Sequence, residues 1–333
     1  MLAIHIILHH IKKAILLSVF FFTLESSQAQ LKYEYGFSVG SMKYDGDVAS
    51  VNGSGFSTLF NRASRSKPAA SIYLGYRPFE FITLRASVTA GSIEAADALL
   101  TGTDPSTIAK KIRNIYFKSM IAEIGLGVEI YPTVLFDRYS LDVAGKIRPY
   151  FTINTAGFHF NPQGIYVNQY GSAKWVDLKP LRTEGQGMPN HPDRKEYRLN
   201  QRATPIGVGV KYFISHRTSM SFEILYRSTK TDYLDDVSTK YIDNNDFDAF
   251  FGTASNTATI AKQLANYPAY KNGGNYVSGY GIDGLRGSPK YNDRYFTSSI
   301  KFIYRFGKNE GSDNLIRSRR AAPACPKNVY RYF

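Results

Sequence analysis

The chain has 333 residues, with 41 Lys and Arg against 27 Asp and Glu, and a formal net charge of +14 at pH 7. Its single cysteine, Cys325, excludes stabilisation by an internal disulfide. The positive charge is not gathered in a basic helix or a zinc-finger pattern, which argues against nucleic-acid binding and favours contact with anionic lipid headgroups, lipopolysaccharide or an acidic partner.

Residues 1–29 have the pattern of a signal peptide. Lys12 and Lys13 precede an apolar run from Ala14 to Leu24, and a small-x-small site ends at Ala29. The alternative is a helix retained in the membrane. Such a helix needs about 20 apolar residues, and the run 14–24 is too short for that. We therefore expect Sec-type export with cleavage near Ala29. No later segment approaches 18 consecutive apolar residues, which argues against a helical membrane protein.

Apolar and polar residues alternate along the mature chain, a pattern typical of half-buried β-strands. In residues 82–90, for example, Ile82, Leu84 and Val88 lie on one face, while Thr83 and Arg85 lie on the other. The pattern predicts eight strands, at about 32–44, 69–77, 82–90, 119–130, 148–159, 204–212, 219–227 and 295–306. The connections at 78–80, 132–146 and 215–218 are short or moderate, whereas those at 45–66, 94–115, 160–200 and 228–290 are long and polar.

The polar face decides between a soluble and a membrane barrel. A lipocalin-like barrel would show long charged side chains to water, but here this face is rich in Gly, Ser and Thr with isolated charges. Such residues suit the filled interior of a narrow barrel. We therefore predict an all-β fold for residues 30–306, an eight-stranded antiparallel up-and-down transmembrane β-barrel with long extracellular loops and short periplasmic turns. Seven charges are predicted to face its lumen: Arg85, Glu123, Glu129, Lys211, Glu223, Lys301 and Arg305.

Residues 307–333 change character and form a basic C-terminal tail. Two interpretations stay open, a disordered tail and a periplasmic docking segment.

Asp232, Asp235 and Asp236 crowd together where the chain leaves the predicted strand 219–227. Their spacing lacks the alternating oxygen ligands and central Gly of a calcium loop. We expect a structural role, with turns capped by the carboxylates and with ion pairs to Arg227, Lys230 or Lys240. Bridging of a divalent cation or of lipopolysaccharide is the alternative, and catalysis the third option.

Two further motifs carry weaker signals. The segment Thr183–Gly187, TEGQG, has no Lys-Ser/Thr pair of a phosphate loop, so we predict a tight, shaped external turn. His159 is the one histidine in the right zone for an interfacial lipid hydrolase, but no serine stands out as its partner. We predict no metal, no cofactor and no catalytic residue.

The segments 175–187 and 205–241 together resemble the PorG-like outer-membrane β-barrel family of the Bacteroidota. The matching residues include Trp175, Thr183, Glu184, Gly185, Gln186, Gly187, Pro205, Lys211, Glu223, Arg227, Thr231, Asp232, Tyr233, Leu234, Asp235, Asp236 and Tyr241. This resemblance implies a non-enzymatic component of the type IX secretion and gliding machinery. It also implies periplasmic ring partners, a PorK-like lipoprotein and a PorN-like protein.

Two rival functions remain at this point. The long loops 160–200 and 228–290 could bind a host or polysaccharide ligand, which would make the protein a surface-binding or adhesion barrel. An interfacial lipid enzyme using His159 is the third hypothesis.

Overall fold

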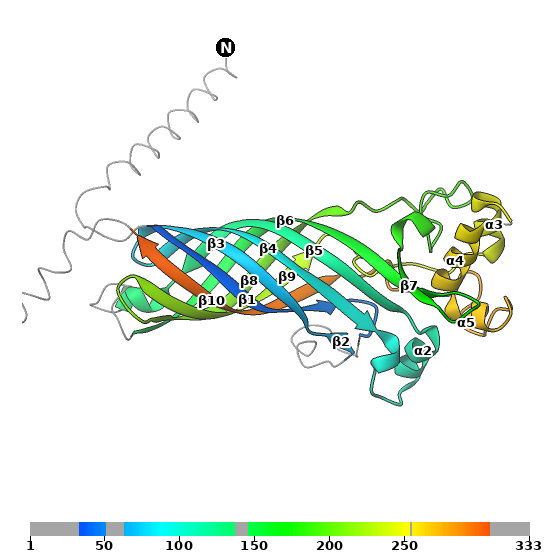
Figure 1. The fold of residues 1–333 in the computed structure, drawn as a ribbon, viewed down its shortest axis with the longest axis horizontal. Coiled ribbons are helices and arrows are strands. Elements are labelled where there is room, and N and C mark those ends of the chain that lie inside the picture. Colours follow the sequence, from blue (N-terminus) through cyan, green and yellow to red (C-terminus); the bar gives the residue numbers. More distant parts are fainter. Residues whose placement is uncertain (1–32, 51–62, 137–145, 254, 307–333) are drawn as a thin grey trace, which may run out of the picture. The chain divides into compact units, whose positions relative to one another are not determined.

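The structure is a computed structural model that describes residues 33–50, 63–136, 146–253 and 255–306. The predicted signal peptide and basic tail lie outside the described residues. Eight long antiparallel strands pair in the cyclic order β1-β3-β4-β5-β6-β8-β9-β10 and close into a barrel (Figure 1). These strands are β1 Tyr33–Asp45, β3 Lys67–Phe79, β4 Ile82–Ala96, β5 Tyr116–Ile130, β6 Ile147–Val167, β8 Asn200–Phe213, β9 Thr218–Thr229 and β10 Arg294–Phe306.

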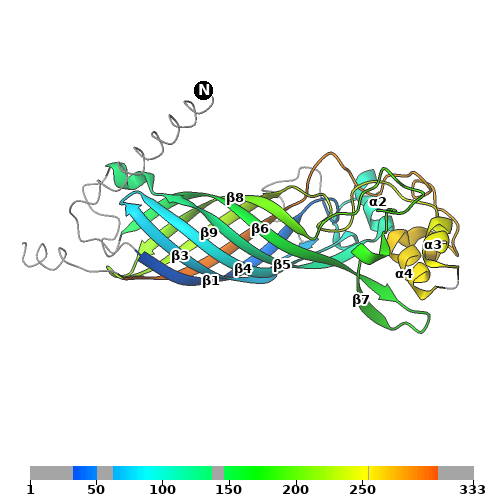
Figure 2. The same cartoon turned by 90° about the horizontal axis from the view of Figure 1, so that it is seen from above.

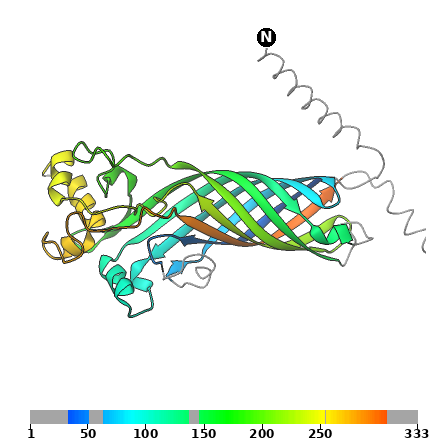
Figure 3. The ribbon, with the colours of Figure 1, turned by 180° about the vertical axis from the view of Figure 1, so that it is seen from behind.

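The prediction of an eight-stranded antiparallel barrel is confirmed. β1 starts and β10 ends at the same end of the barrel, which also carries the β3–β4 and β8–β9 turns (Figures 1 and 3). The described parts of the long connections lie at the opposite end. The alternation of side chains fixes the register, since a slip of one residue would exchange the inner and outer faces.

The barrel is apolar outside and polar inside. Outward side chains such as Ile72, Met120 and Ile124 are 65–67% exposed. The polar residues that alternate with them, such as Arg85 and Lys211, are buried. This is the reverse of a water-soluble barrel, and it makes a continuous apolar outer surface.

Several strands run further than the sequence pattern predicts. β4 and β5 stay paired up to Ala96↔Tyr116, and β6 continues to Val167. The predicted loops 94–115 and 160–200 therefore begin too early, since β4 ends at Ala96 and β6 at Val167. The extensions bury Ile93, Phe117 and Phe160 beneath the long connections. Two short strands join them: β2 Ser64–Arg65 pairs with β4, and β7 Ala173–Asp177 forms a hairpin with the end of β6 (Figure 2).

Helices occupy the long connections, where the sequence pattern predicts only loops, and one short helix, η3, lies in the connection 132–146. Asp104 caps α2 by accepting from the Thr107 amide, and Pro105 starts the helix, so this element had a readable N-terminal signal. No helix in the described part of the chain is long and apolar enough to cross a bilayer. The helices are η2 Asp97–Leu99, α2 Pro105–Arg113, η3 Pro132–Phe136, η4 Lys179–Leu181, α3 Asn244–Phe251, α4 Asn256–Ala265 and α5 Tyr267–Lys271.

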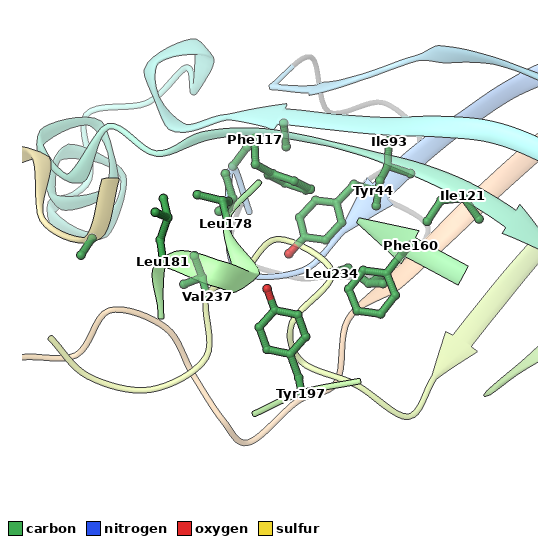
Figure 4. Close-up of a cluster of buried hydrophobic side chains, with 14 of the residues drawn as sticks. Tyr44, Ile93, Phe117, Ile121, Phe160, Leu178, Leu181, Tyr197, Leu234 and Val237 are labelled. Carbon is green, nitrogen blue, oxygen red and sulfur yellow. The ribbon is translucent and has the colours of Figure 1, made fainter. Parts of the chain in front are cut away.

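The main hydrophobic core lies at the long-loop end rather than midway along the barrel. Tyr44, Phe117 and Phe160 from the strand ends pack with Leu178 and Leu234 from the connections (Figure 4). We call the described parts of 46–66, 97–115, 168–199 and 230–293 the cap. Because the cap shares one apolar core with the strand ends, it is a packed structure rather than a set of independent loops.

Candidate functional site

A charged network fills the lumen of the barrel. Arg85 Nη1 lies 2.6 Å from Glu223 Oε2 and 3.2 Å from Glu129 Oε1. Lys301 Nζ lies 3.2 Å from Glu129 and 3.3 Å from Glu223, and Lys211 Nζ is 3.4 Å from Glu129. The Tyr73 hydroxyl donates to Glu34, and the Tyr150 hydroxyl donates to Glu223. With these two tyrosines, the network contains one residue from each of the eight barrel strands: Glu34, Tyr73, Arg85, Glu129, Tyr150, Lys211, Glu223 and Lys301.

These side chains leave no water-filled channel at their level. The six charged groups are at most 5% exposed, and each lies against an opposite charge. Buried charges are tolerated when they are paired and hydrogen-bonded in this way. At this height the lumen is therefore closed.

The seven predicted lumen charges are all buried, but they do not form one group. Five of them belong to the network above. Glu123 instead binds Arg227, with Nε 2.7 Å from Oε2, and also accepts from Tyr295 Oη at 2.6 Å. The Arg305 guanidinium lies over the Phe213 ring, 4.4 Å from its centroid. Glu34 and Arg227 were not among the predicted lumen charges, although both lie on the inner face by strand alternation.

A second buried hydrogen-bond network joins the two sequence motifs in the cap. We call it the mouth knot, and its members are Thr183, Glu184, Asp236, Ser238, Thr239 and Arg286. Glu184 accepts hydrogen bonds from the amides of Ser238 and Thr239, both at 2.9 Å, and from Arg286 Nη1 at 3.1 Å. Thr183 Oγ1 donates to Asp236. Although about 50 residues separate them, segments 183–187 and 231–239 therefore fold as one unit.

Backbone conformation shapes both halves of the mouth knot. Gly185 and Gly187 have φ of 80° and 70°, and Asp236 has φ of 64°. A Cβ on Gly185 would lie 2.6 Å from His191 Cδ2, so that position has neither the conformation nor the space for a side chain. The TEGQG segment thus forms a tight turn beneath other residues of the cap.

Tyr44 connects the mouth knot to the barrel wall. Its hydroxyl lies 2.5 Å from Asp235 Oδ2 and 2.7 Å from Asp293 Oδ1. A phenol has one proton and can donate to only one of these oxygens. Both contacts are satisfied when the other carboxyl group keeps its own proton and donates it to the phenol oxygen.

Burial explains why a carboxyl group in this place keeps a proton. Loss of water contact, together with the Asp47 charge, raises the pKa of Asp235 to about 8. Burial and the Asp235 charge raise the pKa of Asp293 well above its usual range. Burial also raises the pKa of Asp232 to about 8 and that of Asp236 to about 6.

Asp232, Asp235 and Asp236 do not form the ion pairs that the sequence predicts for them. Arg227 is bound to Glu123 inside the barrel, and Lys230 and Lys240 form no salt bridge with these aspartates in the described chain. The arginine at the mouth knot is Arg286, 4.0 Å from Asp236. Sequence reasoning missed Arg286 because it lies 50 residues beyond Asp236, in a connection with no periodic pattern.

The other motif residues lie away from the mouth knot. Trp175, on β7, stacks edge-on against Tyr116, and the Lys118 ammonium is 4.1 Å from its ring centroid. His159 is exposed, with Nδ1 2.8 Å from Asn200 Oδ1, and no contact joins it to a serine among the described residues. Within the same residues, no group of three or more His, Cys, Asp or Glu side chains could hold a metal ion.

Comparison with known proteins gives structural neighbours only. No family model and no curated protein matches the chain. Neisserial surface protein A is 11% identical, with a TM-score of 0.33 over 84% of this chain and 100% of that one. A major outer membrane protein from Thermus thermophilus is 12% identical, with a TM-score of 0.34 over 82% and 99%. Ail of Yersinia pestis, in complex with a heparin analogue, is 7% identical, with a TM-score of 0.32 over 83% and 99%. With scores this low, the fold assignment rests on the strand pairing described above.

Proposed function

We propose that the protein is a non-enzymatic outer-membrane barrel that anchors or organises a periplasmic type IX secretion complex. The observation that carries the membrane assignment is the inverted barrel, with charges inside and exposed Ile, Leu, Phe and Met outside. A closed antiparallel barrel satisfies its backbone hydrogen bonds internally, as hydrocarbon requires. The predicted signal peptide provides the route to this membrane.

The closed lumen favours a scaffold over a conduit. Since paired charges fill the cross-section, secreted cargo would have to pass elsewhere. Partners on the periplasmic side would meet the β3–β4 turn at 78–80, the β8–β9 turn at 215–218, the connection 132–146 or the basic tail 307–333. A PorK-like lipoprotein and a PorN-like ring protein are the partners that the family resemblance implies.

The secretion role rests on the resemblance carried by segments 175–187 and 205–241. In the structure these motif residues build the mouth knot and part of the lumen network. They account for the architecture of the barrel mouth, whereas docking to a ring would use the opposite end.

A crosslinked pull-down from outer membranes tests this proposal. A tagged full-length chain should recover periplasmic ring lipoproteins, and a chain ending after Phe306 shows whether the tail carries the docking. Deletion of the gene should impair secretion and gliding. Recovery of no periplasmic partner, together with intact secretion in the deletion strain, would refute the scaffold role.

A second candidate function, surface binding, is favoured by the packed cap. The long connections carry helices, a hydrophobic core and buried ion pairs, which a set of passive loops would not need. Limited proteolysis of whole cells tests this function. Cap sites that become protected when a host extract or polysaccharide is added would support it, and unchanged cleavage would count against it.

A further inference from the structure

Two hollows adjoin on the surface of the cap, and we call them together the cap cleft. One, of about 360 Å³, lies between the extended ends of β4, β5 and β6 and the helices α4 and α5. The other, of about 500 Å³, lies between α2 and α5. Asn114 and Tyr267 line both hollows, so the two share a border. Each volume is within the range of small-molecule sites, about 300–1,000 Å³.

The first hollow offers mainly apolar surface. Ile115, Ile165, Val167 and Leu264 are among its lining residues. Arg65 also lines it, but its Nη1 lies 3.0 Å from Glu94, so its charge is already compensated. Buried Arg286 is likewise paired with Glu184. This half of the cleft can therefore accept a hydrocarbon or aromatic body without leaving a charge unpaired.

The second hollow adds positive charge without a matching acid. Lys111 donates to the Gly102 carbonyl at 3.0 Å, and Lys271 is exposed. Neither lysine forms a salt bridge with any residue that the structure describes. The neighbouring Lys110 is held by Ser50, with Nζ 2.6 Å from Oγ, so it is directed elsewhere.

We propose that the cap cleft binds an anionic amphiphile. Its aliphatic or aromatic body would occupy the hollow beside Ile115 and Leu264, and a carboxylate or phosphate would lie between Lys111 and Lys271. A cationic ligand would meet two like charges, and an uncharged one would leave both lysines unused. The site lies at the opposite end of the barrel from the proposed periplasmic docking surfaces, so it does not depend on the secretion role.

Calorimetry on the full chain in phosphatidylcholine nanodiscs tests this site, with empty discs as the blank. The probes are octanoate, octyl phosphate and octanol, which share a chain and differ in the headgroup. Native protein should bind at least one of the two anions saturably and more tightly than octanol. The tighter anion identifies the headgroup as a carboxylate or a phosphate.

Three variants assign the binding to the cleft. Lys111→Gln with Lys271→Gln should weaken anion binding about tenfold, since each exposed ion pair contributes a few-fold, and should leave octanol unchanged. Lys174→Gln with Lys290→Gln, two cap lysines that do not line the cleft, should bind like native protein. Ala98→Phe adds bulk at an exposed position of the apolar hollow and should weaken all three probes.

Two results would overturn the proposal. One is anion binding within twofold of native in the Lys111 and Lys271 double variant, and the other is octanol binding as tightly as the anions. The same double variant should still recover ring partners in the crosslinked pull-down. Failure of the ligand site and failure of the scaffold role therefore give different results.

Discussion

At the scale of single residues, the most informative arrangement is one phenol between two buried carboxyl groups. Tyr44 Oη lies within 2.7 Å of both Asp235 and Asp293, although 249 residues separate Tyr44 from Asp293. Asp47 adds negative charge nearby, and Arg113 is the cation that opposes it at Asp235. The folded cap therefore holds a proton that the unfolded chain would release at neutral pH.

Because the folded cap holds this proton, we predict that the cap becomes less stable as the pH rises. A carboxyl group whose pKa is raised by folding binds more protons in the folded state. Its contribution to stability is fully present below its ordinary pKa, about 4, and is lost as the pH rises through about 8, the value for Asp235. Cleavage of the cap by a protease should accordingly become faster between about pH 6 and pH 9, after correction for protease activity.

Asp293→Asn is the matched variant for this effect. An Asn amide can accept from the Leu234 amide, as Asp293 does at 2.8 Å, and can donate to Tyr44 without taking up a proton. We expect its cap cleavage to depend much less on pH than that of the native chain. An equal rise in both proteins would show that the shared proton does not control the cap.

At the scale of elements, closure of the barrel depends on small residues at the β1–β10 seam. A Cβ built on Gly40 would lie 2.1 Å from the Ser298 carbonyl oxygen and 2.6 Å from Ser299 Cα. Both are groups of the adjacent strand β10, and backbone cannot move aside as a flexible side chain can. Glycine is therefore required where these two strands approach closely.

We predict that Gly40→Ala lowers the free energy of unfolding by about 1–3 kcal/mol, the usual cost of overpacking. Gly157→Ala is the control, because a Cβ on Gly157, on the exposed face of β6, meets nothing within 4 Å. Urea unfolding in lipid vesicles, followed by the gel shift between folded and unfolded barrel, measures both variants. Equal stability of the two variants would contradict a tight seam.

A comparison of the predicted and observed strands and helices shows which features can be read from the sequence. Alternation predicted all eight barrel strands because the two faces of each strand meet different environments, as Leu84 and Arg85 do. The same method missed α2, whose Asp104-Pro105 start was a usable signal. It could not pair Glu184 with Arg286 or Tyr44 with Asp293, since such contacts depend on how long connections fold over one another and leave no local pattern.

At the scale of the whole molecule, the lumen network links all eight strands at one level. Glu129 alone lies within 3.4 Å of cations from β4, β8 and β10. Removal of one partner from such a cluster would leave a buried charge uncompensated, which typically costs about 3–5 kcal/mol. The network thus acts both as a plug and as a cross-link of the barrel wall.

The plug predicts that the native protein does not conduct ions. In planar bilayers it should give no steady current, whereas a water-filled porin under the same conditions serves as the positive control. Arg85→Ser with Glu223→Ser removes one charge of each sign from the centre of the network, where the two groups are 2.6 Å apart. This variant should admit water and small ions and show step-like currents, provided that its gel shift shows a folded barrel. A steady current through the native chain would mean that the paired charges open in the membrane, and the scaffold role would then lose its main structural support.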